Sequence, residues 1–203
     1  LSADALPNTN SLRLLGSLRW DVLKPQGTFT VGSGPNSVVF DGINIWVGIG
    51  GGTSITKLRA SDGANLGSIN IGQQINKLAF DGTNIWVTNS GPGTVTKVRA
   101  SDGANLGSFP AVASASGIAF DGASIWVTSV SASTVVKIQA SDGANLGTFA
   151  VGSFPTAAVF DGANIWVSNN NSGNVTKLRA SDGANLGTFP VVASGARARG
   201  MAC

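Results

Sequence analysis

A 40-residue unit repeats four times along this chain, and the period does not shift from one copy to the next. Each copy has a Phe-Asp-Gly triplet with a tryptophan six residues after the phenylalanine. The phenylalanines are Phe40, Phe80, Phe120 and Phe160, and the tryptophans are Trp46, Trp86, Trp126 and Trp166. A fixed period of this length is typical of repeat architectures, in which one unit cannot bury its apolar face alone.

Composition narrows the class of protein. Of 203 residues, 42% are hydrophobic, 11% are charged and 28 are glycine, which favours a compact, turn-rich β protein over a disordered chain. The net charge is +3 and lysines recur once per repeat, as on solvated strands, so no nucleic-acid-binding patch is expected. No apolar run approaches the roughly 20 residues of a membrane-spanning helix, so no membrane span is expected.

The third repeat shows the predicted local structure. Asp121-Gly122 and the segment 141–145 are tight-turn signals, because glycine tolerates positive φ and aspartate caps a turn. The runs between them are rich in β-branched residues, and none has helical spacing. The predicted strands are 116–120, 124–128, 134–140 and 146–151.

Four short antiparallel strands, named A to D in chain order, predict an all-β fold, a β-propeller of four-stranded antiparallel blades. The alternative is a β-solenoid, whose coils are usually shorter and lack two tight hairpin turns per unit.

Ile85-Trp86-Val87-Thr88-Asn89 resembles the YVTN-type bacterial β-propeller repeat, with tryptophan in place of tyrosine. The resemblance covers about residues 12–203 and implies that strand A is innermost and strand D outermost in each blade. The repeat style is also similar to that of the streptogramin (virginiamycin B) lyases. Those enzymes rely on a histidine, and this chain has none, so the likeness does not imply their activity.

The repeat boundaries predict five blades in a single domain, 1–203. Residues 12–32 match strands C and D of an earlier blade, and 200–203 matches the strand A segment 117–120. The C-terminal strand would then pair with the N-terminal strands and close the ring, giving a monomer. The alternative is four blades with an unclosed remnant that pairs with another chain as a homo-oligomer. The predicted segments are a partial blade 1–32, full blades 33–72, 73–112, 113–152 and 153–192, and a closing strand 193–203.

The marked residues have structural interpretations. The tryptophans and phenylalanines are predicted to pack in the core between blades, although a ring of sugar-stacking tryptophans is an alternative. All ten acidic residues are aspartates, and eight of them belong to the turns of the repeats.

With no histidine and a single cysteine, Cys203, we expect no metal site, no cofactor and no catalytic triad. The chain is predicted not to be an enzyme. Two converging aspartates, as in glycosidases, remain an alternative.

Differences among the copies point to one face. The A–B and C–D turns are nearly identical in all repeats, whereas the B–C and D–A connections vary and emerge together at the other end of the blades. Loops on a rigid scaffold commonly carry binding residues, and drift alone should also have changed the C–D turns. The predicted ligand-binding residues are Asn36, Gln73, Gln74, Asn76, Lys77, Asn89 and Asn169.

These polar, mostly uncharged side chains predict a non-catalytic propeller that acts in binding or as a scaffold. Such a propeller could bind glycans at several sites at once, as a lectin does. The alternative is a protein–protein interaction scaffold at a bacterial surface, and a lyase-like or glycosidase-like enzyme is a third possibility. We expect a secreted, extracytoplasmic or cell-surface location. Because the chain starts at Leu1, a signal peptide is not observable.

Overall fold

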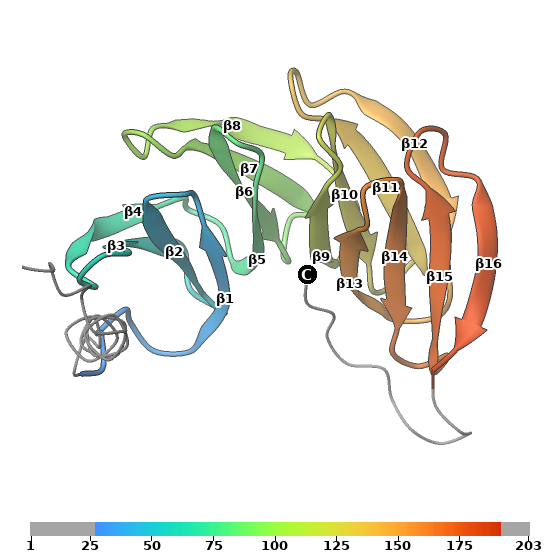
Figure 1. The fold of residues 1–203 in the computed structure, drawn as a ribbon, viewed down its shortest axis with the longest axis horizontal. Coiled ribbons are helices and arrows are strands. Elements are labelled where there is room, and N and C mark those ends of the chain that lie inside the picture. Colours follow the sequence, from blue (N-terminus) through green and yellow to red (C-terminus); the bar gives the residue numbers. More distant parts are fainter. Residues whose placement is uncertain (1–26, 192–203) are drawn as a thin grey trace, which may run out of the picture. The chain divides into compact units, whose positions relative to one another are not determined.

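The computed structural model describes residues 27–191, and this part of the chain contains sixteen β-strands and no helix. The strands form four antiparallel sheets of four strands each (Figure 1). In every sheet the strands lie side by side in chain order, as in β1-β2-β3-β4, so each 40-residue repeat makes one meander. The predicted all-β propeller fold with four-stranded antiparallel blades is therefore confirmed.

The strand bounds follow the repeat. The first sheet consists of β1 (Pro35–Phe40), β2 (Asn44–Ile49), β3 (Ser54–Arg59) and β4 (Asn65–Asn70). The second consists of β5 (Ile75–Phe80), β6 (Asn84–Asn89), β7 (Thr94–Arg99) and β8 (Asn105–Pro110). The third consists of β9 (Ala115–Phe120), β10 (Ser124–Ser129), β11 (Thr134–Gln139) and β12 (Asn145–Ala150). The fourth consists of β13 (Pro155–Phe160), β14 (Asn164–Asn169), β15 (Asn174–Arg179) and β16 (Asn185–Pro190).

The strands of the third sheet begin and end within one residue of the predicted bounds. Hairpin turns fix this agreement, because the turn residues set where each strand must stop. The segment 121–123 separates β9 from β10, and the segment 140–144 separates β11 from β12.

The core lies between successive sheets. Trp46, Trp86 and Trp126 are fully buried, and each packs in one cluster with residues of the next sheet. Trp86, for example, shares its cluster with Ile125 and Val127 of β10. The predicted packing of the tryptophans between blades is confirmed for these three, whereas Trp166 of the fourth sheet is half-buried.

The phenylalanines of the Phe-Asp-Gly triplets are less buried than predicted. Phe40 is 54% exposed, and Phe80, Phe120 and Phe160 are half-buried at the margins of the core clusters. Each is the last residue of its strand and lies next to the A–B turn, so the chain covers it from one side only. The prediction that these side chains are core residues was wrong for Phe40.

The first strands of the sheets lie next to one another. Contacts join β1 to β5, β5 to β9, and β9 to β13. The Ser37 hydroxyl of β1 accepts a hydrogen bond from the backbone N–H of Leu78 in β5 at 2.9 Å. This agrees with the expectation that strand A is the innermost strand of each blade.

Several predictions concern residues outside the described part of the chain. These are most of the partial blade 1–32, the closing strand 193–203 and therefore the five-blade closure. Within residues 27–191, no helix has the length and hydropathy needed to cross a membrane.

Candidate functional site

The connections between strands segregate to two ends of the sheets, as the sequence predicted. In the first sheet, the backbone N–H of Ala60 in the C–D turn donates to the carbonyl of Ile43 in the A–B turn at 3.1 Å. At the other end, the N–H of Ile71 donates to Thr53 O at 2.8 Å, which joins the D–A and B–C connections. The two ends are called the turn end and the loop end below.

At the turn end, one aspartate per repeat organises the A–B turn. The Oδ1 atom of Asp81 accepts hydrogen bonds from the backbone N–H groups of Thr83 and Asn84 at 2.9 and 2.6 Å. Its Oδ2 accepts from the indole Nε1–H of Trp86 at 2.7 Å. The same 2.7 Å indole bond recurs in the other three repeats. The turn predicted from Asp-Gly is confirmed, and its aspartate also anchors the buried tryptophan.

These hydrogen bonds lower the pKa of the carboxyl groups. For Asp81, burial raises the pKa, but the bonds from Trp86 and Asn84 and from the turn backbone outweigh it, so the net pKa is below the usual value. Asp41 follows the same balance. The pKa of Asp161 is lowered chiefly by the bond from the Trp166 indole. The lowered pKa marks a carboxylate engaged in the turn rather than a proton donor.

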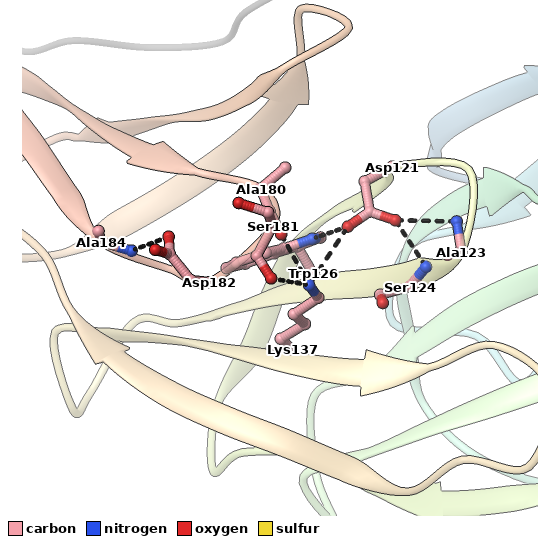
Figure 2. Close-up of polar contacts among 9 residues, drawn as sticks. All are labelled: Asp121, Ala123, Ser124, Trp126, Lys137, Ala180, Ser181, Asp182 and Ala184. Atoms are coloured by element: carbon pink, nitrogen blue, oxygen red, sulfur yellow. Dashed lines mark hydrogen bonds and ion pairs between the residues drawn. The ribbon is translucent and has the colours of Figure 1, made fainter.

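A lysine of strand C joins each sheet to the next. Lys57, Lys97 and Lys137 donate from Nζ, each at 2.7 Å, to the carbonyls of Ala100, Ala140 and Ala180 in the following C–D turn. The ammonium groups also lie 4.9, 5.0 and 5.2 Å from the ring centroids of the tryptophans in their own sheets. Figure 2 shows Lys137 between Trp126, Asp121 and the turn that contains Ala180.

The glycines of the second, third and fourth C–D turns, Gly103, Gly143 and Gly183, pack against the preceding sheet. A Cβ atom on Gly143 would lie 2.0 Å from the Phe109 ring, and one on Gly183 would lie 2.0 Å from the Phe149 ring. Both glycines also have positive φ, 79° and 76°. Any side chain here would displace a ring of the neighbouring sheet.

These contacts explain why the C–D turns are nearly identical among the copies. The contacts at the junctions between sheets constrain the sequence of the C–D turns. The uniformity of these turns is therefore no evidence that the variable loop end was selected for binding. The inference that drift alone should have changed the C–D turns was therefore wrong. A binding role for the loop end needs support from its own geometry.

At the loop end, the first strands of all four sheets line a cavity of about 450 Å³. Its polar lining residues are Asn36, Ser37, Lys77, Thr156 and Asn170. Its aliphatic wall is formed by Val38, Leu78, Ile118, Ala157 and Ala158, with Gly117 between. Of the lining residues within 27–191, none is acidic or aromatic. Such a lining offers both hydrogen-bonding groups and apolar surface to a small ligand.

A break in register of the first strands shapes this lining. The pairing of β5 with β6 shifts between Ile75 and Leu78, and each of the other first strands has a similar irregularity near its start. A hydroxyl of the second strand satisfies the backbone at the break. Thr88 Oγ1 accepts from Lys77 N–H at 2.8 Å, and Thr128 Oγ1 accepts from Gly117 N–H at 2.7 Å. Such bulges commonly re-aim side chains near binding sites.

Of the predicted ligand-binding residues, Asn36 and Lys77 line the cavity. Both belong to strands, β1 and β5, rather than to loops as predicted. Asn76 also lies in β5 and donates from Nδ2 to Ala115 O at 3.2 Å. Gln73 and Gln74 lie in the D–A loop, where Gln74 Oε1 accepts from the Ser90 hydroxyl at 3.1 Å.

Asn89 and Asn169 have a different position from the predicted one. Both are 0% exposed, at the ends of β6 and β14. Asn89 Nδ2 donates to the hydroxyls of Thr94 and Thr96, at 3.0 and 2.7 Å, and so clamps the B–C loop. Asn169 makes the corresponding bonds to Asn174 and Thr176. Their expected exposure on the loop surface was wrong, because the last residue of strand B turns inward under its own loop.

Sequence reasoning missed Ser37, Thr156 and Asn170 and the whole aliphatic wall. A signal for the wall was present. If strand A is innermost, its alternate residues face the neighbouring first strands, which places Val38, Leu78, Ile118 and Ala158 at one level. The side chains at this level differ in size among the copies.

Among residues 27–191, no group of three or more histidine, cysteine, aspartate or glutamate side chains is placed to hold a metal ion. The aspartates of this segment lie in the turns of the opposite end. The cavity therefore offers hydrogen bonds, one cation and apolar surface.

No protein-family model matches this chain, and neither does any curated protein sequence. Among solved structures, it is similar to a hydrazine synthase of Kuenenia stuttgartiensis, with a TM-score of 0.71 and 18% identity over 81% of this chain and 51% of that one. It is similar to a streptogramin B lyase, with a TM-score of 0.67 and 19% identity over 81% and 57%. It is also similar to the WD40 repeats of RRP9, with a TM-score of 0.70 and 17% identity over 81% and 52%.

The chain spans about half the length of each of these proteins. They include enzymes and a WD40 repeat protein. At this level of identity the likeness shows a shared β-propeller fold and transfers no activity.

Proposed function

We propose that this protein is a non-catalytic binding propeller that holds a short peptide segment of a partner protein in the cavity at the loop end. The observation that carries the proposal is the cavity itself, to which the first strands of all four sheets contribute. It lies opposite the turn end, where the repeated polar side chains are already engaged with one another. The YVTN-type repeat resemblance and the WD40 neighbour are consistent with an interaction role.

The cavity chemistry favours a peptide over a sugar. Sugars commonly stack on aromatic rings, and the described part of the chain contributes no aromatic residue to the lining. Three of the repeated tryptophans are 0% exposed, which removes the alternative of a sugar-stacking ring for them. An aliphatic wall beside amides and hydroxyls suits a peptide, which presents backbone polar groups and apolar side chains together.

A non-catalytic role is supported by the state of the ionisable groups. The sequence contains no histidine or glutamate, and turn hydrogen bonds hold the pKa of Asp41, Asp81 and Asp161 low. These carboxylates lie in A–B turns, away from the cavity lining.

The test is capture of a synthetic random-peptide library by the purified protein, with a glycan array in parallel. The cavity-filling variant is Ala158→Leu, which takes its new side chain from the equivalent Leu78 of another repeat and so suits the fold. The matched control is Ala163→Ile in the A–B turn, which takes its new side chain from the equivalent Ile43. We expect Ala158→Leu to lower peptide capture at least tenfold and Ala163→Ile to leave it unchanged.

Two outcomes contradict the proposal. Peptide capture that is unaffected by Ala158→Leu would place binding elsewhere on the molecule. Binding of glycans with no binding of peptides would favour the lectin hypothesis instead.

A further inference from the structure

Lys77 is the one charged side chain of residues 27–191 that does not belong to a repeated set. The other lysines are the junction residues of strand C, the arginines pair with turn aspartates, and the aspartates form the turns. The residues equivalent to Lys77 in the other copies are Ser37, Gly117 and Ala157. A charge at this position is therefore not needed to build a sheet of this kind.

The ammonium of Lys77 lies at the cavity, and the described lining residues place no carboxylate beside it. Its Nζ donates to the Asn36 carbonyl of the neighbouring sheet at 2.7 Å, and the side chain is half-buried. An ammonium has three donors, so the bond to Asn36 leaves two. Among residues 27–191, none of the cavity-lining side chains is acidic, so this part of the chain supplies no carboxylate to the ammonium there.

Aliphatic surface begins directly beside this charge. Leu78 follows Lys77 in β5, and Val38 and Ile118 line the cavity from the adjacent first strands. Val38 is 64% exposed, whereas Leu78 is 7% exposed and packs in the core cluster of Trp46, so Val38 is the more accessible part of this wall. The cavity volume lies within the range of about 300–1,000 Å³ that is typical of small-ligand sites, which suits one or a few residues rather than a folded surface.

We infer that the cavity binds the C-terminal residue of a peptide, with its carboxylate on Lys77 and its aliphatic side chain on the wall of Val38, Leu78 and Ile118. This inference rests on the proposed function and specifies which part of a peptide is held. A C-terminus is favoured because its carboxylate and its side chain leave the same Cα, which matches a cation and an apolar wall that adjoin. A charged hydrogen bond to Lys77 would supply the preference for an acid over an amide.

The test compares N-acetyl-Ala-Ala-Leu with its C-terminal amide by calorimetric titration against the full-length protein. We expect the acid to bind at least tenfold more tightly than the amide, and this ratio to fall as salt is raised, because a partly exposed ion pair is screened. Lys77→Met, which keeps the apolar stem, should bring the ratio close to one. Lys77→Gly introduces the residue that the third repeat has at the equivalent position, Gly117, and should also bring the acid-to-amide ratio close to one. Agreement between the two variants would exclude a folding defect caused by methionine alone.

Lys97→Met at the turn end is the control, because it also removes one lysine that bonds to a neighbouring sheet. It should keep the acid-to-amide ratio of the unaltered protein, even if its melting temperature falls.

Equal binding of the acid and the amide by the unaltered protein would overturn the inference and leave peptide binding in place. A preference for the acid that survives both Lys77 variants would also overturn it. If neither peptide binds while library capture still depends on Ala158, the inference is wrong and the proposed function stands. If no peptide of any kind is captured, both are wrong.

Discussion

At the scale of single residues, the aspartate of each A–B turn links local structure to the core. Asp81 closes its turn through two backbone hydrogen bonds and holds the buried Trp86 by its indole N–H. A carboxylate at this position therefore stabilises both a hairpin and a junction between sheets. Because the same aspartate–tryptophan hydrogen bond occurs in all four repeats, its small contributions to the free energy of unfolding add up over the molecule.

The lowered pKa values of these carboxyl groups predict acid sensitivity. The pKa of Asp81 is below the reference value of 3.8 in the folded protein, so ionisation favours folding. This contribution is fully present above about pH 5 and is lost as the pH falls through 3.8 towards the lower folded pKa. Asp41 and Asp161 act in the same direction. We expect the melting temperature, followed by circular dichroism, to fall steeply below about pH 4.

The variant Asp81→Asn isolates one such group. It should lower the free energy of unfolding at pH 7 by about 1–3 kcal/mol, because a charged acceptor is replaced by a neutral one. The cost should shrink as the pH falls, since the wild-type carboxylate is itself neutralised there. A cost that is the same at pH 7 and pH 2.5 would show that the charge of Asp81 does not matter.

At the scale of strands and sheets, the first sheet lacks an aromatic contact that the other three sheets share. Phe109, Phe149 and Phe189 of the outermost strands lie 5.6, 5.4 and 5.7 Å from the tryptophan rings of their own sheets, measured between centroids. The first sheet has Ile69 at the equivalent position. A groove of about 250 Å³ is lined there by Ile69, Leu66, Lys57 and the turn 101–103 of the second sheet.

We predict that Ile69→Phe stabilises the protein. The new ring would pack at a tilt on Trp46 and against Gly103, as Phe109 does on Trp86 and against Gly143, and such aromatic pairs are worth about 0.5–1.5 kcal/mol. The reciprocal variant Phe109→Ile should destabilise by a similar amount. Urea unfolding of both variants gives the measurement. Destabilisation by both changes would mean that the first junction is not built like the second.

The sequence predicted the fold better than the site, and the reason lies in what each depends on. Strand bounds depend on local turn chemistry, such as Asp121-Gly122, and the repeat copies that chemistry at fixed spacing. Site geometry depends on which strands meet. The sequence placed Asn36 and Lys77 at the loop end of the sheets, where they lie, but assigned them to loops rather than to strands. It also predicted that Asn89 is exposed, whereas the B–C loop covers this side chain. The aliphatic wall arises from four strands that are far apart in the chain, so the alternation of residues along each first strand predicts it only once the neighbours of that strand are known.

At the scale of the whole molecule, the first sheet shows the effect of having no preceding sheet among residues 27–191. Val38 is 64% exposed, whereas its equivalent Leu78 is 7% exposed. Phe40 is likewise 54% exposed, and its equivalent Phe80 is half-buried. A further blade beside the first sheet would cover such positions, as each of the first three sheets does for the one after it.

The predicted fifth blade, with its inner strand supplied by residues 193–203, remains a prediction with a direct test. Closure of a propeller removes exposed strand edges, which otherwise template pairing with other chains. Deletion of 195–203 should therefore convert a monomer into oligomers, seen by light scattering after size-exclusion chromatography, and should broaden the thermal transition. The full-length variant Cys203→Ser is the control, since the deletion also removes the single cysteine. If the truncated protein stays monomeric and melts as the full-length chain does, these residues do not close the ring.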